Sequence, residues 1–229
     1  MKKALFAVLA VFVIGSVAVA QGAPATDAKP AGKLAIIKLP APKLDGGMPL
    51  MQALSKRQST RTITDAKLSE QQLSEVLWAA DGANRPNGHR TAPSAIAKYP
   101  VDIYAVLPEG VYLYDVAKHE LNPVAEGDFR KQAGRQDFVY IAPLNLVYVA
   151  DFDKFKVGAK PGSTMSDEQM MTWAAVEAGA MVQNVYLYSA SEGLGSVIRG
   201  SVDGPAFLKV INARPSQHVI CAQTVGHPK

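Results

Sequence analysis

The feature that most constrains the fold is a long helix predicted after residue 166. Ser166 and Gln169 have the spacing of a capping box, in which a hydroxyl and an amide three residues later bond the free N–H groups of a first helical turn. From there to about Ser191 the sequence is apolar on nearly every side. Such a helix must be buried, so we expect it in the core or against a partner chain. Gly193-Leu194-Gly195 is expected to end it.

The other predicted elements are two early helices, a later one and several strands. A first helix is expected to end near Arg57, and Ser69 is the expected N-cap of a second that ends at Asp81-Gly82. Asp203 is expected to cap a helix that runs through Ile211. Alternating or buried apolar runs predict strands, at 101–107, 111–114, 144–150, 196–198 and 217–225, with a short extended piece at 34–39. This order predicts an α+β (mixed α/β) fold.

The N-terminus predicts export. Met1-Lys2-Lys3 is a short basic region, and an almost unbroken apolar run, Ala4 to Val17, follows it. Ala18-Val19-Ala20 then supplies the small residues of a cleavage site. Residues 1–20 are therefore predicted to be a cleavable secretory signal peptide, the alternative being an uncleaved anchor. Cleavage implies a periplasmic or secreted protein with no stable membrane anchor.

Composition narrows the function further. Removing residues 1–20, which carry two lysines and no acid, lowers the net charge from +4 to +2, so nucleic acid is not an expected partner. No histidine has a His, Cys or acid partner at ligand spacing, so no metal site is predicted. Cys221 is the single cysteine and is expected to be a buried core thiol. Residues 21–47 are expected to be a flexible leader before one domain, 48–229.

A basic cluster, Ser55 to Arg61, lies where the first helix is expected to end. Arginine suits a phosphate because its planar fork donates paired hydrogen bonds and stays charged. The alternative is a set of helix-end cations that complement the helix dipole. Gly193 to Gly200 is not a dinucleotide loop, because such a loop follows a strand and opens a helix, and here the order is reversed. Its glycines fit a place where the backbone comes close to something flat.

Four stretches carry a resemblance to a known family. They are Arg57 to Arg61, Arg90 to Ala95 with Tyr99-Pro100, Gly193 to Gly200 after the long helix, and Val225 to Pro228. In this order and spacing the chain resembles the FMN-dependent nitroreductase family, over about residues 48–228. Within that family it resembles the SagB-type or ThcOx-type dehydrogenases of peptide azoline oxidation.

The resemblance implies a central, mostly antiparallel sheet flanked by helices, with the long buried helix at a homodimer interface and FMN as the cofactor. It implies that Arg57 and Ser59 hold the FMN phosphate. Arg61 would lie beside the pyrimidine edge, where a cation stabilises the negative charge that develops on reduction. The other implied cofactor-binding residues are Gln58 at the ring edge, Pro93, Ser94 and Ala95 from the partner subunit, the backbone of Gly200 and Ser201 near N5 and O4, and Lys229. Many members continue with further basic residues, whereas this sequence ends at Lys229, so Arg57 is expected to hold the phosphate nearly alone.

The resemblance implies little acid–base catalysis by side chains, because the flavin carries the hydride chemistry. Lys98 and Tyr99 are the candidate catalytic pair for proton handling, since they follow the interface motif. The alternative is that Tyr99 packs at a strand start and Lys98 is solvated. Asp151 and Asp153 have no evident partner and are expected in a strand-end turn.

Two functions remain open at this point. The first is an exported FMN-dependent oxidoreductase that transfers hydride through the flavin to or from a small organic substrate, such as a nitro or quinone-like compound. The second is a non-catalytic secreted binding or interaction protein that keeps the fold. For an exported oxidoreductase the usual nicotinamide electron donor is not expected, because nicotinamide cofactors are not expected to be plentiful outside the cytoplasm.

Overall fold

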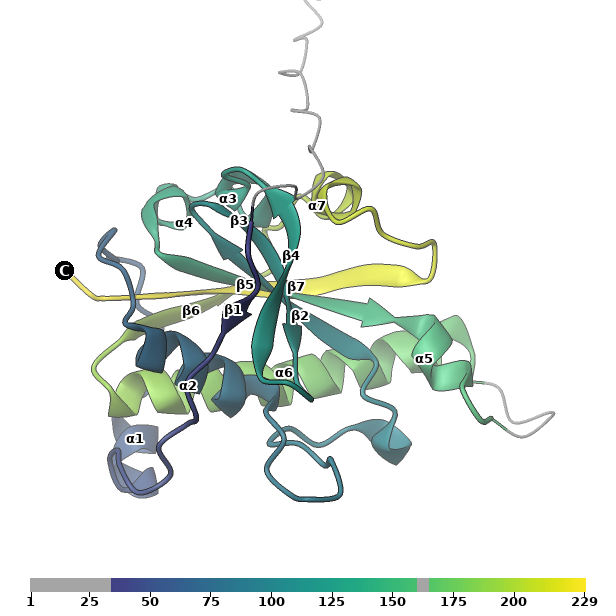
Figure 1. The fold of residues 1–229 in the computed structure, drawn as a ribbon, viewed down its shortest axis with the longest axis horizontal. Coiled ribbons are helices and arrows are strands. Elements are labelled where there is room, and N and C mark those ends of the chain that lie inside the picture. The colour runs from purple at the N-terminus through teal and green to yellow at the C-terminus, as the bar shows by residue number, and fades with distance from the viewer. Residues whose placement is uncertain (1–33, 160–164) are drawn as a thin grey trace, which may run out of the picture.

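The computed structural model describes residues 34–159 and 165–229, and the predicted signal peptide lies outside them. A seven-stranded sheet in the order β1-β4-β3-β2-β5-β7-β6 forms the centre, and each neighbouring pair is antiparallel (Figure 1). The strands are β1 Ile37–Lys38, β2 Val101–Leu107, β3 Gly110–Asp115, β4 Glu120–Glu126, β5 Leu144–Asp151, β6 Gly195–Arg199 and β7 Gln217–Gly226. The predicted α+β fold with a mostly antiparallel sheet is confirmed.

Helices cover both faces of the sheet (Figure 1). The helices are α1 Leu50–Lys56, α2 Glu70–Asp81, the 3-10 turn η1 Ala95–Ala97, α3 Arg130–Ala133, α4 Asp137–Ile141, α5 Phe152–Lys156, α6 Asp167–Ser191 and α7 Gly204–Val210. One hydrophobic core lies between the sheet and α2 with α6, and a second lies between the sheet and α3, α4 and α7. Within the described ranges none of the helices combines the length and the hydropathy needed to span a bilayer.

Local sequence signals determine where the main helices begin and end. Ser69 with Gln72 and Ser166 with Gln169 both form complete capping boxes, as predicted. Gly193 follows α6 with φ +70°, a left-handed conformation that glycine adopts at little cost, and so it ends this helix.

Helix α6 is buried on one side only within a single chain. Its inward face, which includes Met181 and Val185, is fully buried. Its outward face leaves Trp173 47 % and Val176 56 % exposed. Trp173 is therefore not a core residue of this protomer. The expectation of burial holds within this chain for the inward face, whereas the outward face exposes Met171, Trp173 and Val176 beside polar residues such as Thr172 and Gln183.

Several short elements differ from the expectations. Strand β4 and helices α3, α4 and α5 were not predicted, and α5 begins where a strand-end turn was expected. Asp151 does have partners: it accepts from Arg214 and Ser216, and it caps α5 by accepting from Asp153 N. Cys221 is partly buried at the edge of the core, and burial raises its pKa to about 12.

The region before residue 48 makes specific contacts where the structure describes it. The expected extended piece is present as β1, which pairs with β4. The Pro40 carbonyl accepts from Ser74 Oγ at 2.5 Å, and Lys43 N donates to Glu75 at 3.1 Å. Residues 37–43 therefore contact the rest of the described chain, and the boundary of the leader at residue 47 stays a prediction.

Candidate functional site

The basic cluster lies along the free edge of the sheet. Thr60 N donates to the Ser196 carbonyl of edge strand β6 at 2.9 Å, and Lys229 N donates to the Thr62 carbonyl at 2.9 Å. At Gly195 a Cβ atom would lie 2.9 Å from the Thr60 methyl group, so only glycine allows this close approach. Residues 57–62 are thereby fixed beside β6 and the C-terminal residues.

Tyr186 of α6 joins the cluster to β6. Its hydroxyl lies 2.8 Å from Ser59 Oγ and accepts from Ile198 N at 2.8 Å. The Arg57 guanidinium lies over the Tyr186 ring, 5.2 Å from its centroid. Tyr186 was not among the predicted site residues, because α6 was predicted to be an apolar helix. A hydroxyl-bearing side chain in such a helix was the available signal.

The predicted cofactor residues of this segment fall into two groups. Gln58 and Lys229 line an open groove of about 590 Å³ together with Thr60, Thr62 and Tyr186. Arg57, Ser59 and Arg61 alternate with the lining residues along the chain and do not line that groove. Arg57 and Ser59 instead contact Tyr186, which lines the groove, so they lie at its border.

The end of β6 offers an accessible backbone. Among the described residues, apart from its chain neighbours, none has an atom within 4 Å of the position that a Cβ would take at Gly200, and Ile198 is 43 % exposed. Ser201 Oγ donates to Gln136 Oε1 at 2.8 Å, which holds this turn against the segment before α4. A flat ligand could therefore approach the backbone here without a side chain in its way.

The segment that carries Pro93, Ser94 and Ala95 has an unusual backbone. Ile96, Ala97 and Tyr99 have φ values of 48°, 51° and 47°, which are left-handed conformations that cost energy for residues other than glycine. Ser94 Oγ accepts from Tyr99 N at 2.8 Å and so closes the turn. Strain of this kind persists only where the surroundings impose it, which marks the segment as a candidate binding loop.

Lys98 and Tyr99 have separate partners in the structure. Lys98 Nζ donates to the Val157 carbonyl, and the Tyr99 hydroxyl lies 2.9 Å from His89 Nδ1. The Arg90 guanidinium stacks 4.3 Å from the Tyr99 ring centroid. Tyr99 therefore has a neighbour able to exchange a proton, whereas Lys98 has a structural partner. Their catalytic role stays a prediction.

Two buried carboxyl groups lie beneath this loop. Glu177 of α6 accepts from Val101 N at 3.3 Å and lies close to the Ser94 hydroxyl, and Asp81 of α2 pairs with Arg90 at 2.5 Å. Burial raises the pKa of Glu177 to about 6, and it raises the pKa of Asp81 to about 7 despite the Arg90 guanidinium. One oxygen of each carboxyl lacks a hydrogen-bond partner among the described residues. Glu177 therefore lies inside the protomer, beneath the loop and the start of β2.

Replacing Glu177 by glutamine is expected to stabilise the protein at pH 8 and to have little effect below pH 4.5. The folded pKa of about 6 lies above the ordinary 4.5, so the stability that the carboxyl contributes is full below pH 4.5 and is lost as the pH rises through 6. Glutamine stays neutral and can still accept from Val101 N. Thermal unfolding at both pH values should show a gain of about 1 to 2 kcal/mol at pH 8 alone. An equal shift at both pH values would contradict this assignment.

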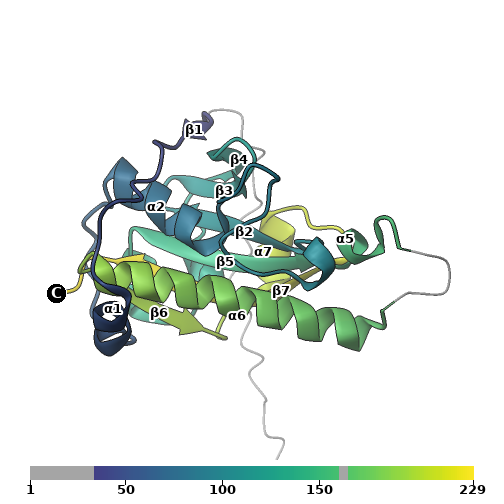
Figure 2. The ribbon, with the colours of Figure 1, turned by 90° about the horizontal axis from the view of Figure 1, so that it is seen from below.

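The two halves of the candidate site lie at different places along α6. Glu177 marks the loop with Ser94, and Tyr186, nine residues later, marks the basic cluster. At 1.5 Å per residue these positions are roughly 13 Å apart along the helix. Figure 2 shows the same arrangement, with α1 and β6 near the C-terminal end of α6 and α5 near the other end. One protomer alone thus does not bring the two sets of predicted residues together.

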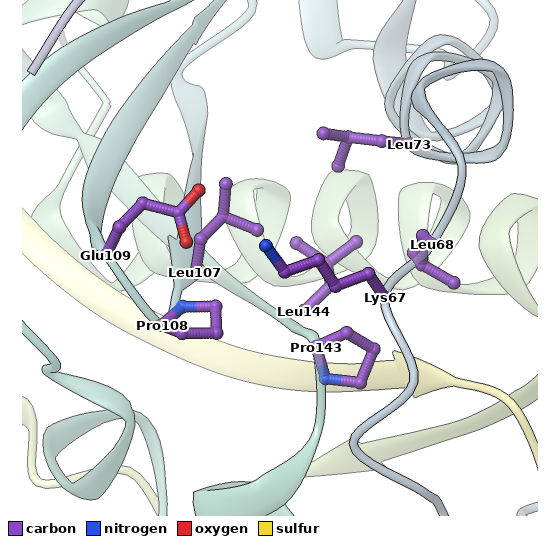
Figure 3. A pocket seen from close by; sticks show the side chains of 8 residues that line it. All are labelled: Lys67, Leu68, Leu73, Leu107, Pro108, Glu109, Pro143 and Leu144. Carbon is purple, nitrogen blue, oxygen red and sulfur yellow. The ribbon is translucent and has the colours of Figure 1, made fainter.

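A separate apolar pocket lies elsewhere (Figure 3). It is formed between the start of α2, the turn from β2 to β3 and the start of β5, with Lys67 and Glu109 on opposite walls and Leu107 and Leu144 between them. Its volume of about 90 Å³ is well below the several hundred that a cofactor ring needs. It is not the site of the predicted residues.

Comparisons with known proteins agree with this fold. A model of the Nitroreductase family matches residues 54–227. A Methanocaldococcus jannaschii protein described as a nitroreductase is 31 % identical over 162 residues, which cover 66 % of this chain and 78 % of that protein. A Ralstonia eutropha crystal structure, also described as a nitroreductase, is 40 % identical with a TM-score of 0.79, covering 88 % of this chain and 94 % of that one. A Desulfovibrio desulfuricans nitroreductase solved in complex with FMN is 21 % identical with a TM-score of 0.55, covering 79 % and 87 %.

The antiparallel sheet with helices on both faces, and a basic segment along its edge strand, define a nitroreductase-like α+β protein. The extent of the family match and the identities to these relatives show more than a shared fold. The chain belongs to the nitroreductase family.

Proposed function

We propose that the protein is an exported FMN-dependent oxidoreductase that transfers hydride through bound flavin to or from a small organic substrate. The observation that carries this proposal is the Tyr186 hydroxyl, which bonds both Ser59 and the backbone of β6. It puts the basic cluster on the sheet edge that also ends in the open backbone at Gly200. Family membership and the FMN complex of a structural relative support the choice of cofactor.

The residues present fit an FMN molecule at this edge. Arg57 and Ser59 would bind the phosphate, and Arg61 would lie beside the pyrimidine edge of the ring. The arginine donors can form paired, charge-assisted hydrogen bonds with phosphate oxygens. The backbone N–H groups at Gly200 and Ser201 would face N5 and O4. Bound FMN supplies reversible acceptance of a hydride, and the chain's own residues bind and orient it.

The proposed active form is a homodimer. Pro93, Ser94 and Ala95 would reach the flavin that the basic cluster of the partner subunit holds, since the two halves of the site lie apart in one chain. The outward face of α6, with Trp173 and Val176, supports this assembly because apolar patches of this kind mark protein interfaces. The antiparallel approach of two copies of α6 would bring each loop to the other protomer's cluster.

The finer assignments belong to the same proposal. The combination of the four family stretches favours the SagB-type or ThcOx-type branch of the family. The signal peptide predicted at residues 1–20 favours the periplasm or secretion. An exported chain would acquire FMN after export and receive electrons from a donor other than a cytoplasmic nicotinamide pool. Lys229 and Gln58 would contribute from the groove side of the segment.

Adding FMN to the purified mature chain is expected to give a stoichiometric flavin complex. Gel filtration should remove free FMN and leave one bound flavin per protomer, detected by its visible absorbance. The bound flavin should then be reduced by a hydride donor and reoxidised by a nitro or quinone acceptor. Absence of flavin absorbance at saturating FMN would exclude the oxidoreductase and favour the non-catalytic interpretation.

A further inference from the structure

A buried guanidinium lies directly beneath the end of β6. Arg199 is 5 % exposed and is the residue before Gly200. Its Nε donates to Thr224 Oγ1 at 2.9 Å, its Nη1 to the Ala133 carbonyl at 2.6 Å and its Nη2 to Asn145 Oδ1 at 3.1 Å. All three acceptors are neutral. Because these acceptors belong to β5, β7 and α3, the side chain lies on the sheet face that α3 covers, opposite α6.

No described carboxylate forms an ion pair with Arg199. Burial lowers the pKa of the guanidinium to about 10, so it is still a cation at neutral pH. A buried charge is costly unless something nearby compensates it. Hydrogen bonds alone would be enough to link α3 to the sheet, and a neutral side chain could form them. A structural link therefore does not explain why the side chain is charged.

The surroundings are shaped to hold this group. A Cβ at Gly134 would lie 2.0 Å from Arg199 Nη1, so the turn after α3 has room for the guanidinium only because residue 134 is glycine. Asn145 is itself fixed, since its Nδ2 donates to the Val139 carbonyl at 3.0 Å and its Oδ1 also accepts from Thr224 Oγ1 at 2.6 Å. The position of the charge is therefore rigidly defined.

We propose that the fixed positive charge of Arg199 stabilises the negatively charged, reduced form of the flavin held at the end of β6. This inference rests on the proposed function. A hydride brings two electrons and one proton to neutral oxidised FMN, so the ring of the reduced form carries one negative charge. A cation that is buried and lacks an acidic partner acts on such a charge with little screening by solvent. Arg199 thereby raises the reduction potential of the bound flavin.

The midpoint potential of the FMN-loaded mature protein, measured against a reference dye, tests this inference. Arg199→Met is expected to weaken the preference for reduced over oxidised flavin at least tenfold, which for two electrons lowers the potential by about 30 mV. Asn145→Asp keeps the arginine and places a carboxylate beside it, so it should lower the potential in the same direction. Arg214→Met, which removes an exposed arginine at the far end of β7, is the control and should leave the potential unchanged.

Arg199→Met and Asn145→Asp test the inference independently of each other. If Arg199→Met does not fold, Asn145→Asp still places a negative charge beside the retained guanidinium, with the loss of one hydrogen bond, from Nδ2 to the Val139 carbonyl. An unchanged potential in Asn145→Asp with FMN still bound would overturn this inference alone and leave Arg199 a structural cross-link. Failure of the parent protein to bind FMN would overturn the proposed function, and this inference with it.

Discussion

Replacing Arg57 by alanine is expected to weaken FMN binding by about ten- to a hundredfold. A hydrogen bond to a charged group contributes about 1.5 to 3 kcal/mol, and each 1.4 kcal/mol is a factor of ten in affinity. Arg57 contacts the Tyr186 ring and has no salt bridge with a described acid, so its loss leaves no buried charge unpaired. Fold stability should therefore change little. Calorimetric titration with FMN, together with thermal unfolding of the apoprotein, separates the two effects.

Lys131 provides a matched control for Arg57. It is an exposed cation over a tyrosine ring, 5.9 Å from the centroid of Tyr140, on α3 and away from the basic cluster. Lys131→Ala should bind FMN as the parent does. Equal affinity in the Arg57 and Lys131 variants would show that the phosphate is bound elsewhere.

A second large effect is expected from Val176→Asp. Val176 is 56 % exposed on the apolar face of α6, and in the proposed homodimer this face is buried between the two protomers. An unpaired buried charge costs several kcal/mol, so the affinity between the two protomers should fall more than a hundredfold. The variant should then be a monomer when its mass is measured by light scattering coupled to gel filtration. FMN affinity should fall with it, because the Ser94 loop of the partner would no longer complete the site.

The comparison for Val176→Asp is an equivalent change away from α6. Ile36→Asp alters a β-branched residue of similar exposure, 52 %, next to β1, and should leave both assembly and FMN binding unchanged. A parent chain that binds FMN as a monomer at micromolar concentration would overturn the interface. A Val176→Asp variant that stays dimeric would show that another surface joins the protomers.

Helix ends and the central strands were predictable because their signals are local. Ser69 and Ser166 begin α2 and α6 through hydrogen bonds to residues three positions on, and a turn at Pro108 to Gly110 joins β2 and β3. The four family stretches gave the candidate site residues without any knowledge of distance. Their order along the chain was enough to indicate the fold.

The connections of the site were not predictable, because they join residues far apart in sequence. Nothing near Arg199 indicates that its acceptors are Asn145 and Thr224, or that Gly134 leaves room for it. Strand β4 was not predicted because its sequence, with Pro123 and polar residues, lacks a strand pattern, and pairing with β3 decides its conformation. Tyr186 is a similar case, since its partners come from the cluster and from β6.

The two edges of the sheet have a further consequence for solubility. Unpaired strand edges invite pairing with strands of other molecules, which leads to aggregation. One edge ends in β1, which has only two residues, and the other edge, β6, is covered where Thr60 N donates to Ser196. The segment that carries Arg57 and Arg61 therefore also shields β6 from other chains. Substitutions that loosen this segment would promote aggregation as well as loss of FMN binding. Both effects therefore restrict which residues the segment tolerates.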